Sequence, residues 1–237
     1  MTLEAVLRSP LPARIDGVVE RFRAIESALP ERDGVRAFTS LYLAVTEAVD
    51  ETVRPGAFAD AAFTRWLDVV FANLYLRALR AHVLGPKRPP RAWAALFEAR
   101  SRRGVAPIQF ALAGMNAHIN RDLPLALVET CRARGVAPVR GCPQHDDFRA
   151  IDDVLAATEA RVRAEFATGL VGWADEALGE LDNVVAMWNV RRARAAAWVN
   201  AETLWALRDL PFAGPRFAVT LDRLVGLAGR GLLRPVR

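Results

Sequence analysis

The chain has 237 residues, of which 52% are hydrophobic, and a formal net charge of +5. Such a chain is long enough for one large domain or two small ones, and its hydrophobic content supports a sizeable core and excludes extensive disorder. No apolar run approaches the roughly 20 residues that span a bilayer, and the N-terminal stretch lacks the basic and apolar regions of a secretory signal, so we expect a cytoplasmic protein.

The basic character of the chain invites comparison with nucleic-acid-binding proteins. Its pI is about 10.1, but Lys87 is its single lysine, and acidic residues are interspersed with the many arginines. The densest basic cluster, residues 191–194, has the charge to contact phosphates. Helix-turn-helix, zinc-finger and RNP signatures are missing, so nucleic acid is not an expected partner. Cys131 and Cys142 are too few for a disulfide framework and are not spaced as a zinc knuckle.

Hydrophobic residues recur at helical spacing almost throughout the chain. The pattern predicts helices over residues 13–28, 33–53, 59–84, 91–103, 107–122, 124–134, from Asp146 or Asp147 to about 168, 181–209 and 215–230. Residues 173–179 form either a short helix or the first part of the helix that follows. A break is expected at Leu123-Pro124, because the residue before a proline is pushed out of the α region. We find no convincing strand and no repeat. The sequence therefore predicts an all-α fold, a single compact bundle of about nine helices that forms one domain over residues 1–237.

The helix predicted over residues 107–122 carries polar side chains on two faces. His118 and Asp122 are four residues apart and share one face, whereas Asn116 and Asn120 line the other, with Gly114 between them. One interpretation is structural: Asp122 caps the next helix and binds His118, and the amides connect neighbouring helices. The other is functional: His118 and Asp122 form an acid–base dyad or a pair of metal ligands.

The helix predicted over residues 59–84 places Asp68, Tyr75 and His82 near one stripe of a mostly apolar surface. A buried aspartate must be paired or hydrogen-bonded, or its pKa shifts until it is neutral. Asp68 is therefore expected either in a salt bridge, to Arg65 or to another arginine, or in a catalytic site, with Tyr75 binding substrate.

Two further stretches contain candidate residues. His145, Asp146 and Asp147 are expected in a loop before a helix, where they either cap the helix or contribute to a site. On the helix predicted over 181–209, Trp188 and Arg191 either lie at the surface or line a pocket in which the guanidinium stacks on the indole.

The run Gly-Met-Asn-Ala-His-Ile-Asn-Arg-Asp-Leu-Pro at 114–124, with residues 67–73 upstream and 145–148 downstream, is distinctive. These segments resemble an uncharacterised, mostly actinobacterial family classed as a domain of unknown function. The resemblance covers about residues 38–210 and implies a helical fold, but it implies no activity.

His118, Asp122 and Pro124 are also similar to the His-x-x-x-Asp pair of the zinc-dependent phospholipase C and P1 nuclease group. That group needs about five histidines and this chain has three, so ligand number excludes its trinuclear zinc site. A single divalent metal ion held by His118, Asp122 and His145 is the metal site that the resemblance leaves.

Two functions follow from these residues. In the first, the protein is an enzyme that acts on a small apolar organic molecule. His118 is its base or metal ligand, Asp122 or Asp68 is the partner of His118, and Asn116 and Asn120 donate hydrogen bonds to an oxyanion. In the second, the protein binds a hydrophobic ligand or another helical protein without catalysis. The sequence does not indicate an oligomeric state.

Overall fold

The computed structural model describes residues 1–52, 56, 58–85, 88–168 and 189–235. Within these ranges the chain is helical and contains no strand, which confirms the predicted all-α class. The elements in chain order are α1 (Leu3–Arg8), α2 (Ile15–Ala28), α3 (Gly34–Thr52), α4 (Ala61–Leu84), α5 (Arg91–Ala99), α6 (Pro107–Ala117), the π-helical turn η1 (His118–Asp122), α7 (Leu123–Arg134), α8 (Pro143–Thr168), α10 (Val190–Ala206) and α11 (Ala213–Leu232).

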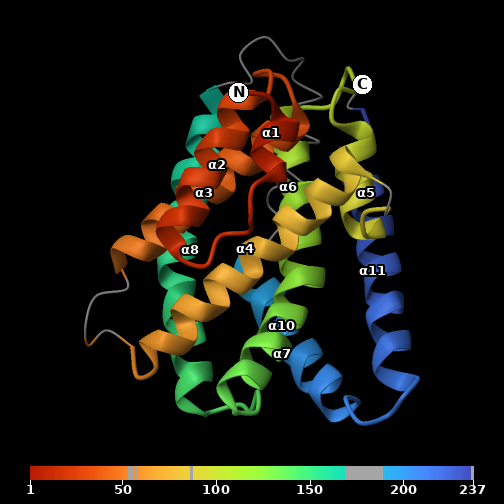
Figure 1. Cartoon of the computed structure of the whole chain (residues 1–237). Coiled ribbons are helices and arrows are strands. Elements are labelled where there is room, and N and C mark those ends of the chain that lie inside the picture. Colours follow the sequence, from red (N-terminus) through yellow and green to blue (C-terminus); the bar gives the residue numbers. More distant parts are fainter. Residues whose placement is uncertain (53–55, 57, 86–87, 169–188, 236–237) are drawn as a thin grey trace.

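The helices surround a continuous helical rod made of α6, η1 and α7 (Figure 1). Helix α4 crosses in front of this rod at an angle, with α1, α2 and α3 towards one end. Helix α8 runs along one side of the molecule, and α11 forms the opposite edge, where it packs on α5 and α6. Because neighbours cover the rod on several sides, side chains on its different faces reach different parts of the interior.

One helix start differs from the sequence prediction. Helix α8 begins at Pro143, so His145 and Asp147 lie inside its first turns and not in a preceding loop. Proline suits the first position of a helix because its missing N–H has no partner there in any case. Residues 173–188, which contain the predicted helix at 173–179 and the first part of that predicted over 181–209, lie outside the described residues. Within the described residues α10 begins at Val190, because Asn189 has an extended backbone and its side chain accepts a hydrogen bond from the Arg192 N–H.

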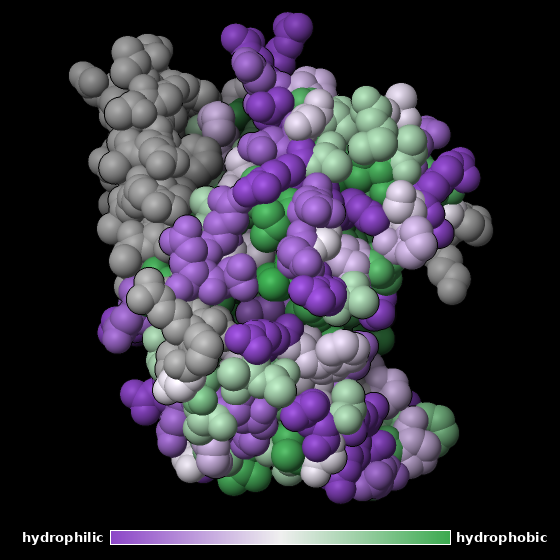
Figure 2. Space-filling model, turned by 60° about the vertical axis from the view of Figure 1, so that its left-hand side comes forward, coloured by the Kyte–Doolittle hydropathy of each residue, from purple (hydrophilic) through white to green (hydrophobic). Residues whose placement is uncertain are grey.

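The buried hydrophobic side chains form two main clusters. One lies among α1–α6 and α11 and includes Phe38 and Trp93. The other lies among α4, η1, α7, α8 and α10 and includes Leu123 and Trp198. Met115 on α6 packs against both clusters. On the face shown in Figure 2, hydrophilic side chains are widespread and hydrophobic ones lie between them in small groups. The interior is therefore divided, and α6 with η1 lies at the junction of its two halves.

Among the described helices, none has both the length and the hydropathy that crossing a membrane requires.

Candidate functional site

The π-helical turn η1 joins α6 to α7 without the break that we predicted at Leu123-Pro124. Leu123 has α-helical backbone angles, and its N–H donates to the carbonyl oxygen of His118, five residues earlier. A proline within an α-helix lacks a donor and clashes with the carbonyl four residues before it, and a wider turn relieves that clash. The rod thus continues through Pro124, and η1 begins at His118 and ends at Asp122.

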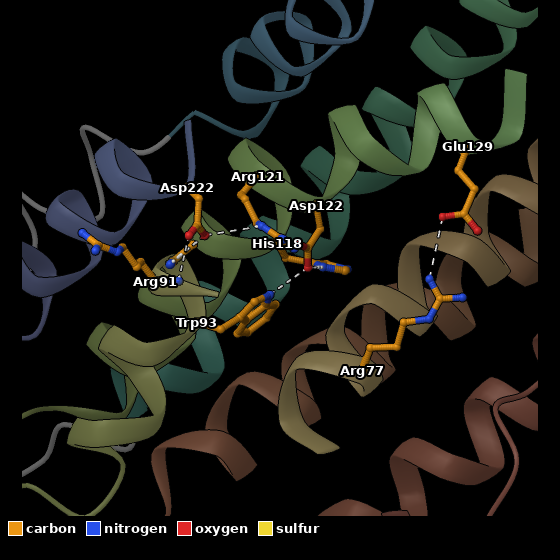
Figure 3. Close-up of polar contacts among 9 residues, drawn as sticks. Arg77, Arg91, Trp93, His118, Arg121, Asp122, Glu129 and Asp222 are labelled. Atoms are coloured by element: carbon orange, nitrogen blue, oxygen red, sulfur yellow. Dashed lines mark hydrogen bonds and ion pairs between the residues drawn. The ribbon is translucent and has the colours of Figure 1, made fainter. Parts of the chain in front are cut away.

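Asp122 lies at the centre of a buried hydrogen-bond network. Its carboxylate is fully buried and accepts from the indole Nε1 of Trp93 at 2.8 Å and from the guanidinium of Arg121. His118 Nδ1 lies 3.3 Å from the same carboxylate oxygen as Trp93 (Figure 3). An ionised carboxylate only accepts, so His118 donates through Nδ1 and its other ring nitrogen, Nε2, is left with a free lone pair. The predicted contact between His118 and Asp122 is therefore present.

The imidazole of His118 is held between aromatic rings. It stacks on Phe71 with the ring centroids 3.5 Å apart and the planes 5° from parallel, and the Tyr42 ring lies 4.4 Å away. Nε2 is buried and has no hydrogen-bond partner among the described residues. Burial lowers the pKa of His118, and the opposing effect of Asp122 is smaller. The ring is therefore an uncharged imidazole whose basic nitrogen is available to a ligand.

His118 lines a cavity of about 120 Å³ between the two hydrophobic clusters. An apolar cavity of about 150 Å³ is large enough for benzene, so this one has room for a molecule of about one small ring. Its polar lining comes from Tyr42, Thr46, Asp68, His118 and Arg194. The other lining residues are apolar: Ile15, Phe38, Leu41, Val45, Val49, Leu67, Phe71, Ala72, Ile108, Leu112, Met115, Ile119, Leu123, Phe148, Ile151, Leu155 and Val190.

Asp68 brings a carboxyl group to the same cavity. It lies on α4, one turn before Phe71, and burial raises its pKa to about 7, with the positive charge of Arg194 opposing that rise. Asp68 is half-buried and forms no hydrogen bond or ion pair with other described residues, so the salt bridge to Arg65 is not formed. Near neutral pH the carboxyl group is therefore divided between its protonated and ionised forms.

Arg194 and Tyr42 complete the polar part of the cavity. The guanidinium of Arg194 is buried, donates to Asp152 Oδ1 and to the carbonyl oxygen of Phe148, both at 2.6 Å, and covers the Phe148 ring at 3.9 Å. Burial raises the pKa of Tyr42 well above its usual value, with further contributions from the negative charges of Asp68 and Asp122. Tyr42 is thus a neutral hydroxyl and Arg194 is a cation held in place by protein acceptors.

Neither Tyr42 nor Arg194 was predicted as a site residue, although the sequence around each contains a pattern that indicates burial. Tyr42 follows Phe38 by four residues, so it lies on the apolar face predicted for that helix. Arg194 shares the face of α10 that buries Val190, Ala197 and Trp198, and one arginine on an apolar face indicates a buried charge.

Four of the predicted site residues form their contacts away from the cavity. The amide of Asn116 donates to the carbonyl oxygen of Val225 on α11, and Asn120 donates to Asn116 Oδ1. The Tyr75 hydroxyl is 2.7 Å from Thr39 Oγ1 in the core, and Arg191 pairs with Asp153 at the surface. None of these four side chains belongs to the cavity lining. Trp188, the remaining predicted substrate-binding residue, lies outside the described residues.

His145, the third predicted metal ligand, has other partners. Its Nδ1 accepts from the Gly141 N–H at 3.1 Å, and its ring lies 4.7 Å from that of Trp198. Asp147 accepts from the N–H groups of Ala59 and Asp60, which fixes the start of α4. Within the described part of the chain, no three His, Cys, Asp or Glu side chains are grouped to hold a metal ion. Among these described side chains, His118 and Asp122 thus form a dyad without a third ligand.

Comparison with known proteins places the chain in a family without assigning it an activity. No curated protein and no solved structure matches it. The model of a family of unknown function (DUF5995) matches residues 15–235. This match spans most of the sequence, including every residue of the cavity lining, and the chain therefore belongs to this family of unknown function.

Proposed function

We propose that this protein is an enzyme that moves a proton on a small, largely apolar organic molecule, and that His118 is its general base. One observation supports this most strongly: the His118 ring lines an apolar cavity, and its Nε2 has no hydrogen-bond partner among the described residues while Nδ1 is held by Asp122. A buried nitrogen without a partner costs on the order of 1–3 kcal/mol, and a bound ligand that donates to it removes that cost. A base must also be uncharged before it acts, and burial favours that state here.

The other polar residues have separate roles in this proposal. Asp122 holds the imidazole in one tautomer and stabilises the imidazolium formed when Nε2 takes the proton. Asp68 returns a proton to the other end of the reacting molecule, because its raised pKa leaves it partly protonated near neutral pH. Arg194 stabilises negative charge that develops on the substrate. We assign no oxyanion role to Asn116 and Asn120 in this proposal, because their amides bond to each other and to α11.

The proposal predicts that the protein removes a proton from a small carbon acid. A suitable probe is 1-nitropropane in D₂O, in which a base takes a proton from the carbon beside the nitro group and deuterium replaces it. We expect the protein to accelerate this exchange, measured by proton NMR, and His118→Gln to lower the protein-dependent rate by roughly 100- to 10,000-fold. The rate should rise with pH as His118 loses its proton.

His82 provides the matched control, because it lies near the end of α4, stacks on Phe97 and does not line the cavity. His82→Gln should retain the wild-type rate. Equal exchange rates for wild-type protein and His118→Gln would reject the general base. If both nonetheless bind toluene with the same affinity, the cavity serves a non-catalytic hydrophobic-ligand-binding protein.

A further inference from the structure

Helix α11 presents two different faces. Its inner face buries Val225, Gly226 and Gly229 against α5, and a Cβ atom at Gly226 would lie 2.7 Å from the carbonyl oxygen of Arg91. The carboxylate of Asp222 accepts from the N–H groups at the start of α5. These close contacts fix the rotation of α11, and the side of the helix that does not contact α5 is exposed at the edge of the molecule (Figure 1).

Large apolar side chains lie on that outward face. Phe212, at the start of the helix, is 72% exposed, Val219 is 50% exposed and Leu227 is 65% exposed. Arginines alternate with them, so that positions 212, 216, 219, 223, 227 and 230 succeed one another at spacings of four and three residues. Such spacing places all six on one stripe of the helix, about 27 Å long at 1.5 Å per residue. We call these six residues the α11 stripe.

Two of the three arginines in the α11 stripe have no acidic partner among the described residues. Arg216 and Arg223 form no ion pair with other described residues, and Arg230 lies 4.0 Å from Glu98. Asp222 is the acidic residue of α11, and its carboxylate is directed inward towards α5 and Arg121. Exposed apolar side chains of this size, arranged together, mark an interaction surface.

We propose that the α11 stripe docks the protein on an anionic lipid bilayer surface. Phe212, Val219 and Leu227 would enter the boundary between headgroups and acyl chains, while Arg216 and Arg223 bind lipid phosphates. A bilayer offers apolar and anionic partners all along its surface, so it suits a straight stripe in which the two kinds of side chain alternate. The position of α11 at the edge of the molecule lets the whole stripe touch one plane.

Vesicle co-sedimentation tests this directly. We expect the full chain to bind phosphatidylcholine vesicles that contain phosphatidylglycerol, to bind pure phosphatidylcholine vesicles much less, and to bind the anionic vesicles more weakly at high salt. Each arginine near an anionic surface contributes roughly a fivefold factor to partitioning, so Arg216→Gln with Arg223→Gln should lower it by roughly 30-fold. Phe212→Ser with Leu227→Ser should abolish the binding that remains at high salt.

Arg149→Gln with Arg192→Gln is the matched control, because it removes the same charge from exposed positions on α8 and α10. It should bind vesicles as the wild type does. The proposal is overturned if wild-type protein does not bind anionic vesicles, or if the stripe variants bind as well as this control. It is also overturned if sedimentation without lipid shows a dimer that Phe212→Ser with Leu227→Ser dissociates, since the stripe would then contact a second copy of the chain.

Discussion

The two faces of the helical rod carry similar polar residues that have different roles. On one face, Asn116 and Asn120 connect to each other and to α11 through amide hydrogen bonds. On the other, His118 and Asp122 also bind each other, but within the part of the chain that the structure describes His118 Nε2 has no partner, and its ring lines a cavity. The amide face has the properties of a structural contact, and the His118 face has those of a site that a ligand completes.

The largest effect is expected at Asp122, which connects the His118 face to the core. Asp122→Ala leaves the buried donors of Trp93, His118 and Arg121 without their acceptor, and breaking such a network costs about 3–5 kcal/mol. Urea unfolding followed by circular dichroism measures this loss. Asp122→Asn keeps one carbonyl acceptor and should lower the free energy of unfolding by less. A loss below about 1 kcal/mol in the alanine variant would mean that the network does not hold the rod in place.

On the amide face, Asn116→Ala should lower the free energy of unfolding by about 0.5–1.5 kcal/mol, because the bonds of its amide to the Val225 carbonyl and to Asn120 are lost. Binding of phenol in the cavity, measured by calorimetry, should be unchanged. Asn120→Ala changes a less buried position and should lower the free energy of unfolding by a smaller amount. Altered phenol binding in the Asn116 variant would show that the two faces are not independent.

Asp68 gives a pH-dependent test of the cavity. Its pKa in the folded chain is raised to about 7, so the folded state holds this proton more tightly than the unfolded state, and stability is lost as pH rises from about 4 to about 7. Asp68→Asn is uncharged throughout this range. We expect the variant to be more stable than the wild type at pH 8 by on the order of 1 kcal/mol, since the half-buried carboxylate is partly screened by solvent.

Below pH 4 the stability difference between Asp68→Asn and the wild type should vanish. Asp146→Asn, an exposed change on α8, should show no comparable pH dependence. Equal unfolding curves for Asp68→Asn and wild type at pH 8 would place Asp68 in a more solvated position than the structure gives it.

The smallest effect is expected in the pH dependence contributed by His118. Its pKa in the folded chain is lowered, so the unfolded state takes up this proton first, and stability falls as pH falls below about 6.5 towards the folded value. His118→Gln should reduce that slope in unfolding experiments between pH 7 and pH 5. An identical slope would indicate that the imidazole is as solvated in the folded chain as in the unfolded one.

Much of this architecture follows from local pattern. The spacing of apolar residues predicted the helical class and most helix positions, since a helix that buries one side must repeat its apolar residues about every 3.6 positions. The same periodicity placed His118 beside Asp122, and the structure has that contact at 3.3 Å. It also separated Asn116 and Asn120 from this pair. Relations within a single helix are determined by residues three and four apart, and the sequence displays these directly.

The remaining features depend on packing between segments far apart in the chain. The continuous rod through Pro124 requires the π-helical turn, which the rule for residues before proline did not anticipate. Tyr42 on α3, Asp68 on α4, His118 on η1 and Arg194 on α10 meet only because four elements pack around one cavity. Whether Nε2 of His118 has a hydrogen-bond partner likewise depends on all the side chains that pack around the ring. Sequence alone therefore determined the helices and the dyad, and tertiary structure decided which dyad nitrogen is free and what surrounds it.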